Sequence, residues 1–154
     1  MFGELKKLFM DKDDLETNDK YISVPESEMN ENLKRDIVKL ERLGEVYSES
    51  LQKKYKSKFE RDGKRNLKIW VCRDIDGDHI SNLSSEQCLE KEYRSQVAIN
   101  FEGFTDEEDA YIYYIQLWYY FGGYFKGSGA LYDLSKNHLE TDIKEKVEEI
   151  LKQQ

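Results

Sequence analysis

The feature that most limits the fold of this chain is a dense run of aromatic residues between Tyr111 and Phe125. Nine of these fifteen positions are Tyr, Trp or Phe, and none is charged. Aromatic side chains bury large areas, so the run can offset the ordering entropy of a chain that is 36% charged. A helix that is apolar on all sides is usually central in its domain. The sequence therefore predicts a folded core around an aromatic-rich helix over residues 106–121.

The start of this predicted helix has the pattern of a capping box. Thr105 takes the N-cap position and Glu108 the third helical position, and the acidic first turn complements the helix dipole. The tyrosines allow two interpretations. The helix lies wholly in the core, or one edge also contacts another protein, because Tyr and Trp are enriched at interfaces.

A second stripe predicts a long amphipathic helix over residues 30–60. Its apolar positions recur at intervals of three and four residues. Ser27 or Asn30 offers an N-cap, and Gly63 a left-handed C-cap. Gly44 lies on the stripe, where it either weakens the helix by about 1 kcal/mol relative to Ala or lets a neighbour approach closely. The stripe consists of Leu33, Ile37, Leu40, Gly44, Tyr47, Leu51, Tyr55 and Phe59.

The remaining pattern predicts strands and a closing helix. Alternating residues favour strands at about 67–75, 79–83 and 95–102, with Asp76-Gly77 as a hairpin turn between the first two. A short helical excursion fits 84–92, and an apolar stripe predicts a C-terminal helix over 138–151, with Asn137 as its N-cap. We therefore expect an α+β fold: a small antiparallel sheet of three or more strands packed against the long helix, the aromatic-rich helix and the C-terminal helix.

The domain organisation follows from length and composition. A chain of 154 residues fits one domain, which we place at 28–154, after a short N-terminal helix and a polar connector at 1–27. No segment has the roughly 18–20 apolar residues that cross a bilayer, and the first residues do not resemble a signal peptide. Two cysteines do not make a disulfide framework, so we expect a cytoplasmic protein.

Three sets of residues are candidates for chemical sites. Asp74, Asp76 and Asp78 are weak candidates for a divalent cation, because the glycine and the closing glutamate of a calcium loop are misplaced. Cys72, His79, Cys88 and His138 lack zinc-ligand spacing and form no local nucleophile–base pair. The loop 123–129 lacks the ending of a phosphate-binding loop. We therefore expect no catalytic residue, metal or cofactor.

The charge distribution points to a protein partner. The net charge of −8 lies in residues 78–154, which carry 7 basic and 15 acidic side chains. General nucleic-acid binding is disfavoured by the net charge. The basic stretch 53–73 is either a solvated face or a contact for an anionic partner or for the acidic half of a second copy of the chain. We expect a non-enzymatic binding module, such as a toxin-immunity or inhibitor protein that neutralises a basic partner. The alternative is a ligand-binding domain or enzyme with a pocket between sheet and aromatic helix, using His79, Asp74, Asp76 and His138. The expected partner-binding residues are Glu102, Asp106, Glu107, Glu108, Asp109, Tyr113 and Tyr120.

Overall fold

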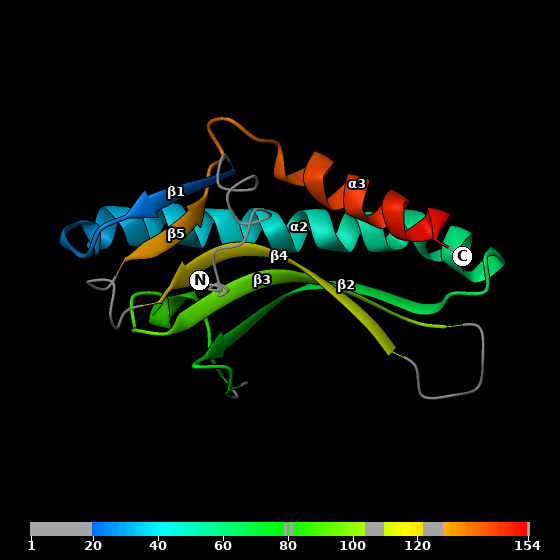
Figure 1. Ribbon diagram of the computed structural model, residues 1–154, viewed down its shortest axis with the longest axis horizontal. Helices are drawn as coiled ribbons and strands as arrows, with labels where there is room; N and C mark the ends of the chain where they lie inside the picture. The colour runs from blue at the N-terminus through cyan, green and yellow to red at the C-terminus, as the bar shows by residue number, and fades with distance from the viewer. Residues whose placement is uncertain (1–19, 79, 81, 104–109, 122–127, 154) are drawn as a thin grey trace, which may run out of the picture.

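The structure, a computed structural model, describes residues 20–78, 80, 82–103, 110–121 and 128–153. Within them, five strands form one sheet in the order β1-β5-β4-β3-β2, and every neighbouring pair is antiparallel (Figure 1). The predicted α+β class is confirmed. In chain order the elements are β1 (Tyr21–Val24), η2 (Glu26–Glu28), α2 (Glu31–Arg61), β2 (Arg65–Ile75), η3 (Ser85–Gln87), β3 (Tyr93–Glu102), β4 (Ala110–Tyr120), β5 (Gly129–Tyr132) and α3 (Leu139–Lys152).

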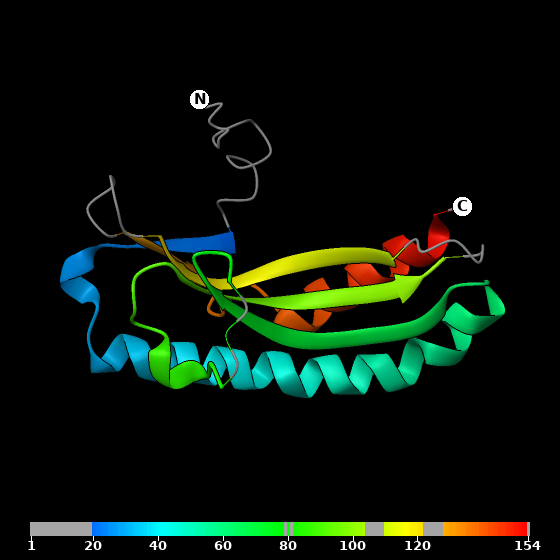
Figure 2. The ribbon, with the colours of Figure 1, turned by 90° about the horizontal axis from the view of Figure 1, so that it is seen from below.

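The helices form one layer and the sheet the other. α2 runs along β2, and α3 packs beside α2. Figure 2 shows the opposite face of β2, β3 and β4, with α3 behind the sheet. Among the described residues no helix covers this second face of the three long strands, so we call it the open face.

The predicted long helix is confirmed as α2, and its ends match the local signals. The Asn30 side chain accepts a hydrogen bond from the Leu33 N–H at 3.1 Å, which is an N-cap. Gly63 has φ +83° just after the helix, as a left-handed C-cap requires. Gly44 permits a close approach, because a Cβ there would lie 3.1 Å from Val71 Cγ2 and 3.2 Å from Leu117 Cδ1.

The predicted aromatic helix is wrong, because residues 110–120 form strand β4. In β4 the aromatic residues alternate between two faces of the sheet. Tyr113 lies opposite Ile99 on the helix-covered face, whereas Tyr114 lies opposite Ala98 on the open face. A strand buried on one face and apolar on the other satisfies the same composition as a helix that is apolar on all sides. The predicted capping box at 105–108 lies outside the described residues.

The hairpin after β2 is confirmed and its return strand is not. Asp76 and Gly77 have positive φ, and an isolated bridge pairs Ile75 with Asp78. No strand forms at 79–83 among the residues described there, and η3 follows with a capping box at Ser84. Strands β1 and β5 were not predicted. The C-terminal helix is confirmed as α3, but its N-cap is His138, without a side-chain cap, and not Asn137. The predicted N-terminal helix falls outside the described residues.

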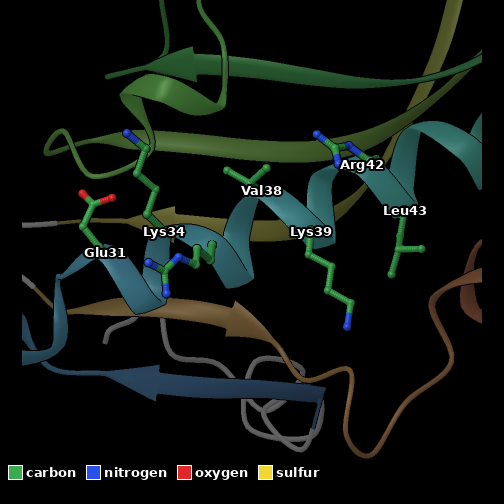
Figure 3. Close-up of a pocket in the computed structure, with 7 residues that line it drawn as sticks. Glu31, Lys34, Val38, Lys39, Arg42 and Leu43 are labelled. Atoms are coloured by element: carbon green, nitrogen blue, oxygen red, sulfur yellow. The ribbon is translucent and has the colours of Figure 1, made fainter.

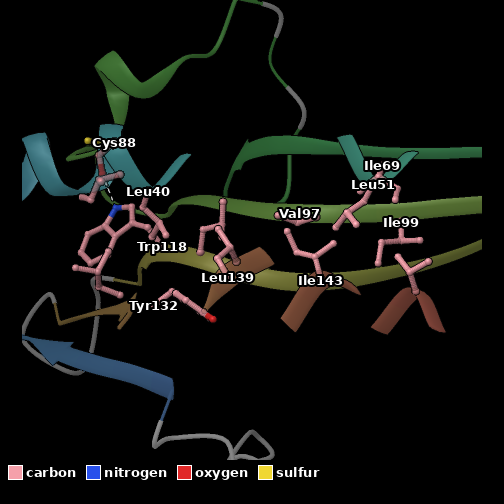
Figure 4. Packing of buried hydrophobic residues seen from close by; sticks show 14 of the residues in the cluster. Leu40, Leu51, Ile69, Cys88, Val97, Ile99, Trp118, Tyr132, Leu139 and Ile143 are labelled. Atoms are coloured by element: carbon pink, nitrogen blue, oxygen red, sulfur yellow. Dashed lines mark hydrogen bonds between the residues drawn. The ribbon is translucent and has the colours of Figure 1, made fainter. Parts of the chain in front are cut away.

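The core lies between the sheet and the two helices (Figure 4). Val97 and Ile99 of β3 and Ile143 of α3 are fully buried there. At one end of the core the Trp118 indole is also fully buried, and its Nε1–H donates to the Cys88 carbonyl at 2.8 Å. This bond joins β4 to the segment after η3, and it satisfies the one polar atom of the largest buried side chain.

Candidate functional site

The candidate site is the open face of the sheet, where β2, β3 and β4 place matched residues in rows. One row contains Trp70, Ala98 and Tyr114, and the next contains Lys68, Asn100 and Ile112. Their strand neighbours Ile69, Ile99 and Tyr113 point toward the helices, so the rows point away from them. Directly paired side chains on one face of an antiparallel sheet lie close enough to act as one surface.

This surface is apolar and partly exposed at its centre. Tyr114 is 49% exposed and Ile112 46%, whereas Ala98 is fully buried in the row between Trp70 and Tyr114. The Lys68 ammonium lies 4.7 Å from the centre of the Trp70 ring, a cation–π contact. Two aromatic rings and an aliphatic side chain thus form a flat platform with one cation beside it. We call Lys68, Trp70, Asn100, Ile112 and Tyr114 the aromatic platform.

At the end of the open face near Tyr119, the charges of Arg94 and Asp74 neutralise each other. Arg94 donates from Nε and Nη2 to Asp74 Oδ2 at 3.2 and 3.1 Å, and its guanidinium lies 5.6 Å from the centre of the Tyr119 ring. Burial, together with the nearby Glu92 carboxylate, raises the pKa of Tyr119. Asp74 is buried and is the acceptor for this arginine, so its charge is not free to attract a partner.

The cation-binding candidates are not brought together as a site. Asp74 Oδ1 accepts from the Gly77 N–H at 3.3 Å, and its other oxygen binds Arg94. Among the described residues, no group of three or more His, Cys, Asp or Glu side chains has the arrangement of a metal site. Asp76 and Asp78 belong to the hairpin turn.

The cysteines and histidines are also separated from one another. Cys72 and Cys88 are free and buried. Burial, with the Glu41 carboxylate next in effect, raises the pKa of Cys88 to about 12, which keeps it a thiol at neutral pH. His138 is exposed at the N-cap position of α3, where its side chain makes no cap hydrogen bond, and His79 lies outside the described residues. The alternative pocket required an aromatic helix facing the sheet, but the aromatic segment is itself a strand of that sheet.

The structure describes three of the predicted partner-binding residues and places them apart from one another. Glu102 is exposed at the end of β3, on the open face beyond Asn100, and pairs with Arg65 at 3.9 Å. Tyr113 points to the helix side, where its hydroxyl donates to Gln153 Oε1 at 3.0 Å. Tyr120 is 4% exposed, so the prediction that it lies on the surface is wrong, and its role in binding stays a prediction. Asp106, Glu107, Glu108 and Asp109 lie outside the described residues, and their role stays a prediction.

The residues of the aromatic platform could not be recognised as neighbours as long as the aromatic run was interpreted as a helix. On a helical wheel, Tyr114 groups with Tyr111 and Trp118, but on a strand it groups with Ile112. The high β-propensity of Tyr, Ile and Trp in 111–120 was the signal that could have revealed a strand. In the predicted strand 67–75, the alternation of side chains places Trp70 on the face opposite Ile69, as the structure does.

A shallow hollow also lies on the outer side of α2 (Figure 3). The side chains that line it all come from this one helix and include Lys34, Arg35, Lys39 and Arg42. Lys34 already binds Glu86 at 3.2 Å, and that hydrogen bond raises the pKa of Lys34. The hollow is therefore a basic strip on the surface of one helix. Its lining residues all belong to α2, so a ligand there would contact a single element.

The comparisons with known proteins identify no relative. No family model matches the chain, and neither a curated protein nor a solved structure matches it. In the part of the chain that the structure describes, no helix is both long and apolar enough to cross a bilayer.

Proposed function

We propose that this chain is a non-enzymatic protein-binding module that holds its partner on the aromatic platform. The observation that carries the proposal is the exposure of Ile112 and of Tyr114, the latter in register with Trp70, on a sheet face that the described helices leave uncovered. Trp and Tyr dominate the hot spots of protein interfaces, and charged residues are depleted at interface centres.

The charges of the open face favour a protein over a nucleic acid. A single-stranded nucleic acid also stacks on aromatic residues, but it needs several cations to neutralise its phosphates. On this face Lys68 lies against Trp70, and Arg94 is neutralised by Asp74. The net charge of −8 repels nucleic acid, and the open face also carries neutral amides that can bond a protein surface. These amides belong to Gln96, Asn100 and Gln116.

An inhibitor or immunity-type protein that neutralises another protein fits this description. Glu102 lies at the rim of the open face, and the predicted acidic residues 106–109 follow it in the chain. Acidic residues around an apolar centre would accelerate association with a basic partner and make the rate depend on salt.

Affinity capture with paired variants tests the proposal. The double variant Trp70→Ala/Tyr114→Ala removes the two aromatic rings, and Val46→Ala removes an exposed apolar side chain from α2. We expect one protein from the native cell to be retained by the wild-type chain and by Val46→Ala. Loss of the two rings should weaken its binding by about 30-fold or more, which corresponds to a hot-spot loss of about 2 kcal/mol.

Two results would contradict the proposal. In the first, the captured partner binds the double variant as tightly as the wild-type chain. In the second, a fluorescent single-stranded oligonucleotide binds the wild-type chain and loses its binding in the double variant. The second result would assign the platform to nucleic acid.

A further inference from the structure

Strand β4 has an open edge over most of its length. It pairs with β3 from Ala110 to Tyr119, whereas β5 pairs with it over Trp118–Tyr120. Among the described residues, the stretch 110–116 therefore has no strand on its outer side, and in Figure 2 this part of the yellow strand is the margin of the sheet. Of the six large apolar side chains described as exposed, three lie in this stretch: Tyr111, Ile112 and Tyr114.

Alternate residues of this edge direct their backbone groups away from β3. The bond from the Tyr21 hydroxyl to the Gln116 carbonyl, at 2.8 Å, shows that this carbonyl points out of the sheet. Backbone groups along a strand point to alternate sides, so Ile112 and Tyr114 also direct their N–H and C=O groups outward. Unpaired groups of this kind are a template for another strand.

The other edges of the sheet are protected, whereas on this one the only side-chain bond among the described residues is that of Tyr21 to the Gln116 carbonyl, at the end nearest β5. At the β2 edge, Gln52 Oε1 accepts from the Ile69 N–H at 2.7 Å, and Ile75 bonds back to Asp78. Strand β2 also carries Arg65, Lys68, Arg73 and Asp74, and β1 is only four residues long. Short edges and charges are how proteins prevent edge pairing. The stretch 110–116 contains no charge, no Pro and no Gly.

We infer that this edge pairs with the same edge of a second copy, antiparallel, about a twofold axis through Tyr113. Tyr113 is the midpoint of residues 111–115, the part of the stretch that lies before the Gln116 carbonyl bonded by Tyr21, so this register pairs 111–115 with itself. Ile112 then lies opposite the partner's Tyr114, and Tyr114 opposite the partner's Ile112. Both residues point their backbone groups outward, so each pair exchanges two hydrogen bonds.

The side chains at this junction are self-complementary, which favours a second copy over a foreign strand. Pairs of an aromatic and a β-branched residue stabilise antiparallel strands, and the twofold axis creates two of them on the open face. An isologous contact of this kind closes after two copies. The dimer has one continuous sheet, and it joins the two aromatic platforms into a single face without covering Trp70.

Sedimentation velocity on the full chain, from low to high micromolar concentration, tests the dimer with charge variants. We expect twice the 18.4 kDa chain mass for the wild type and for the control Val46→Lys on α2. Ile112→Lys/Tyr114→Lys should be monomeric, as should Ile112→Glu/Tyr114→Glu, because like charges then face each other across the axis. A mixture of the two should form the heterodimer. The inference would be overturned by a wild-type chain that sediments as a monomer, or by Lys and Glu double variants that each still sediment as dimers.

A cysteine pair tests the register and does not depend on charge. At the axis, the two copies of residue 113 form a non-hydrogen-bonded pair with Cα atoms about 4.5 Å apart, within the roughly 4.4–6.8 Å of a disulfide. Tyr113→Cys should therefore cross-link to a covalent dimer under mild oxidation, and Tyr111→Cys should not. The reverse pattern would overturn the inference. The dimer and the proposed partner can be tested separately, because Trp70→Ala changes the platform and leaves the β4 edge unchanged. This variant should therefore weaken partner binding without affecting the dimer.

Discussion

The Tyr93 hydroxyl of β3 donates to the carboxylate of Glu41 on α2 at 2.7 Å, and Glu41 is fully buried. The other Glu41 oxygen accepts from Arg73 Nε at 3.0 Å and from the Ser85 hydroxyl at 2.5 Å. One carboxylate thus joins α2, β2, β3 and η3. Its charge is matched by the Arg73 guanidinium, which is the condition under which a buried carboxylate is tolerated.

We predict that Glu41→Ala destabilises the fold by about 3–5 kcal/mol, because it leaves Arg73 partly buried without its main partner. Urea unfolding should show this as a lower midpoint. The matched control is Glu49→Ala, which breaks the exposed pair with Lys53 at 3.4 Å and should change stability by about 0.5 kcal/mol or less. Equal midpoints for the two variants would contradict a structural role for the Glu41 cluster.

We predict that the fold loses stability in the alkaline range through its buried tyrosines. Burial, with the Asp142 charge next, raises the pKa of Tyr21 to about 12, and burial with the Glu148 hydrogen bond raises the pKa of Tyr55 to about 12. Unfolded tyrosine ionises near pH 10. The folded pKa values are the higher ones, so this stability is complete below about pH 10 and is lost as the pH rises toward 12.

Ultraviolet absorbance of tyrosinate checks this, with the titration of the native chain compared with that in urea. Urea unfolding at several alkaline pH values should show the matching fall in stability. Tyr55→Phe is the control variant, because it removes one of the shifted hydroxyls and should make the fall shallower. A native titration that coincides with the unfolded one would contradict the prediction.

The elements that could be predicted from the sequence are those whose signals are local. The cap at Asn30, the apolar stripe and the left-handed residue Gly63 all lie within or beside α2, and the helix follows them. The Asp76-Gly77 hairpin likewise depends on two adjacent residues. Backbone bonds within one segment decide such elements, so tertiary context changes little.

The elements that were missed depend on distant partners. β1 and β5 are four residues each and exist because Tyr21–Val24 pairs with Gly129–Tyr132, more than 100 positions away in the chain. For β4, the length of the aromatic run and an apparent capping box favoured a helix. The segment is a strand because it pairs with β3 over Arg94–Glu102. The exposure of two tyrosines was misjudged for the same reason, since a helical period placed Tyr113 and Tyr120 outward, whereas in β4 Tyr113 faces the helices and Tyr120 is buried.

We predict that Gly129→Ala is strongly destabilising for its size. A Cβ at residue 129 would overlap the Trp118 ring, lying 2.6 Å from Cζ3, and Trp118 is fully buried and held by its bond to Cys88. Overpacking of this kind costs typically about 1–3 kcal/mol. Urea unfolding gives the loss, and near-ultraviolet circular dichroism should show a displaced indole.

Gly103→Ala is the matched control for Gly129→Ala. Its added Cβ would lie 3.0 Å from Tyr111 Cε2, but that ring belongs to a side chain that is 43% exposed and can turn away. We therefore expect a smaller change in stability and an unchanged indole signal. A Gly129→Ala chain as stable as the Gly103→Ala chain would contradict the close packing of Trp118 against β5.

Hydrogen exchange should distinguish the protected edge of the sheet from the open one. The Ile69 N–H on β2 is bonded to the Gln52 side chain, so it should exchange slowly in the wild type and fast in Gln52→Ala. The outward N–H groups of Ile112 and Tyr114 have no strand partner in the described part of a single chain, so they should exchange fast at low protein concentration. If the edges of two copies pair, these two amides become protected as concentration rises, while Ile69 does not change. Slow exchange at Ile112 and Tyr114 in a dilute, monomeric sample would show that the edge is already covered within one chain.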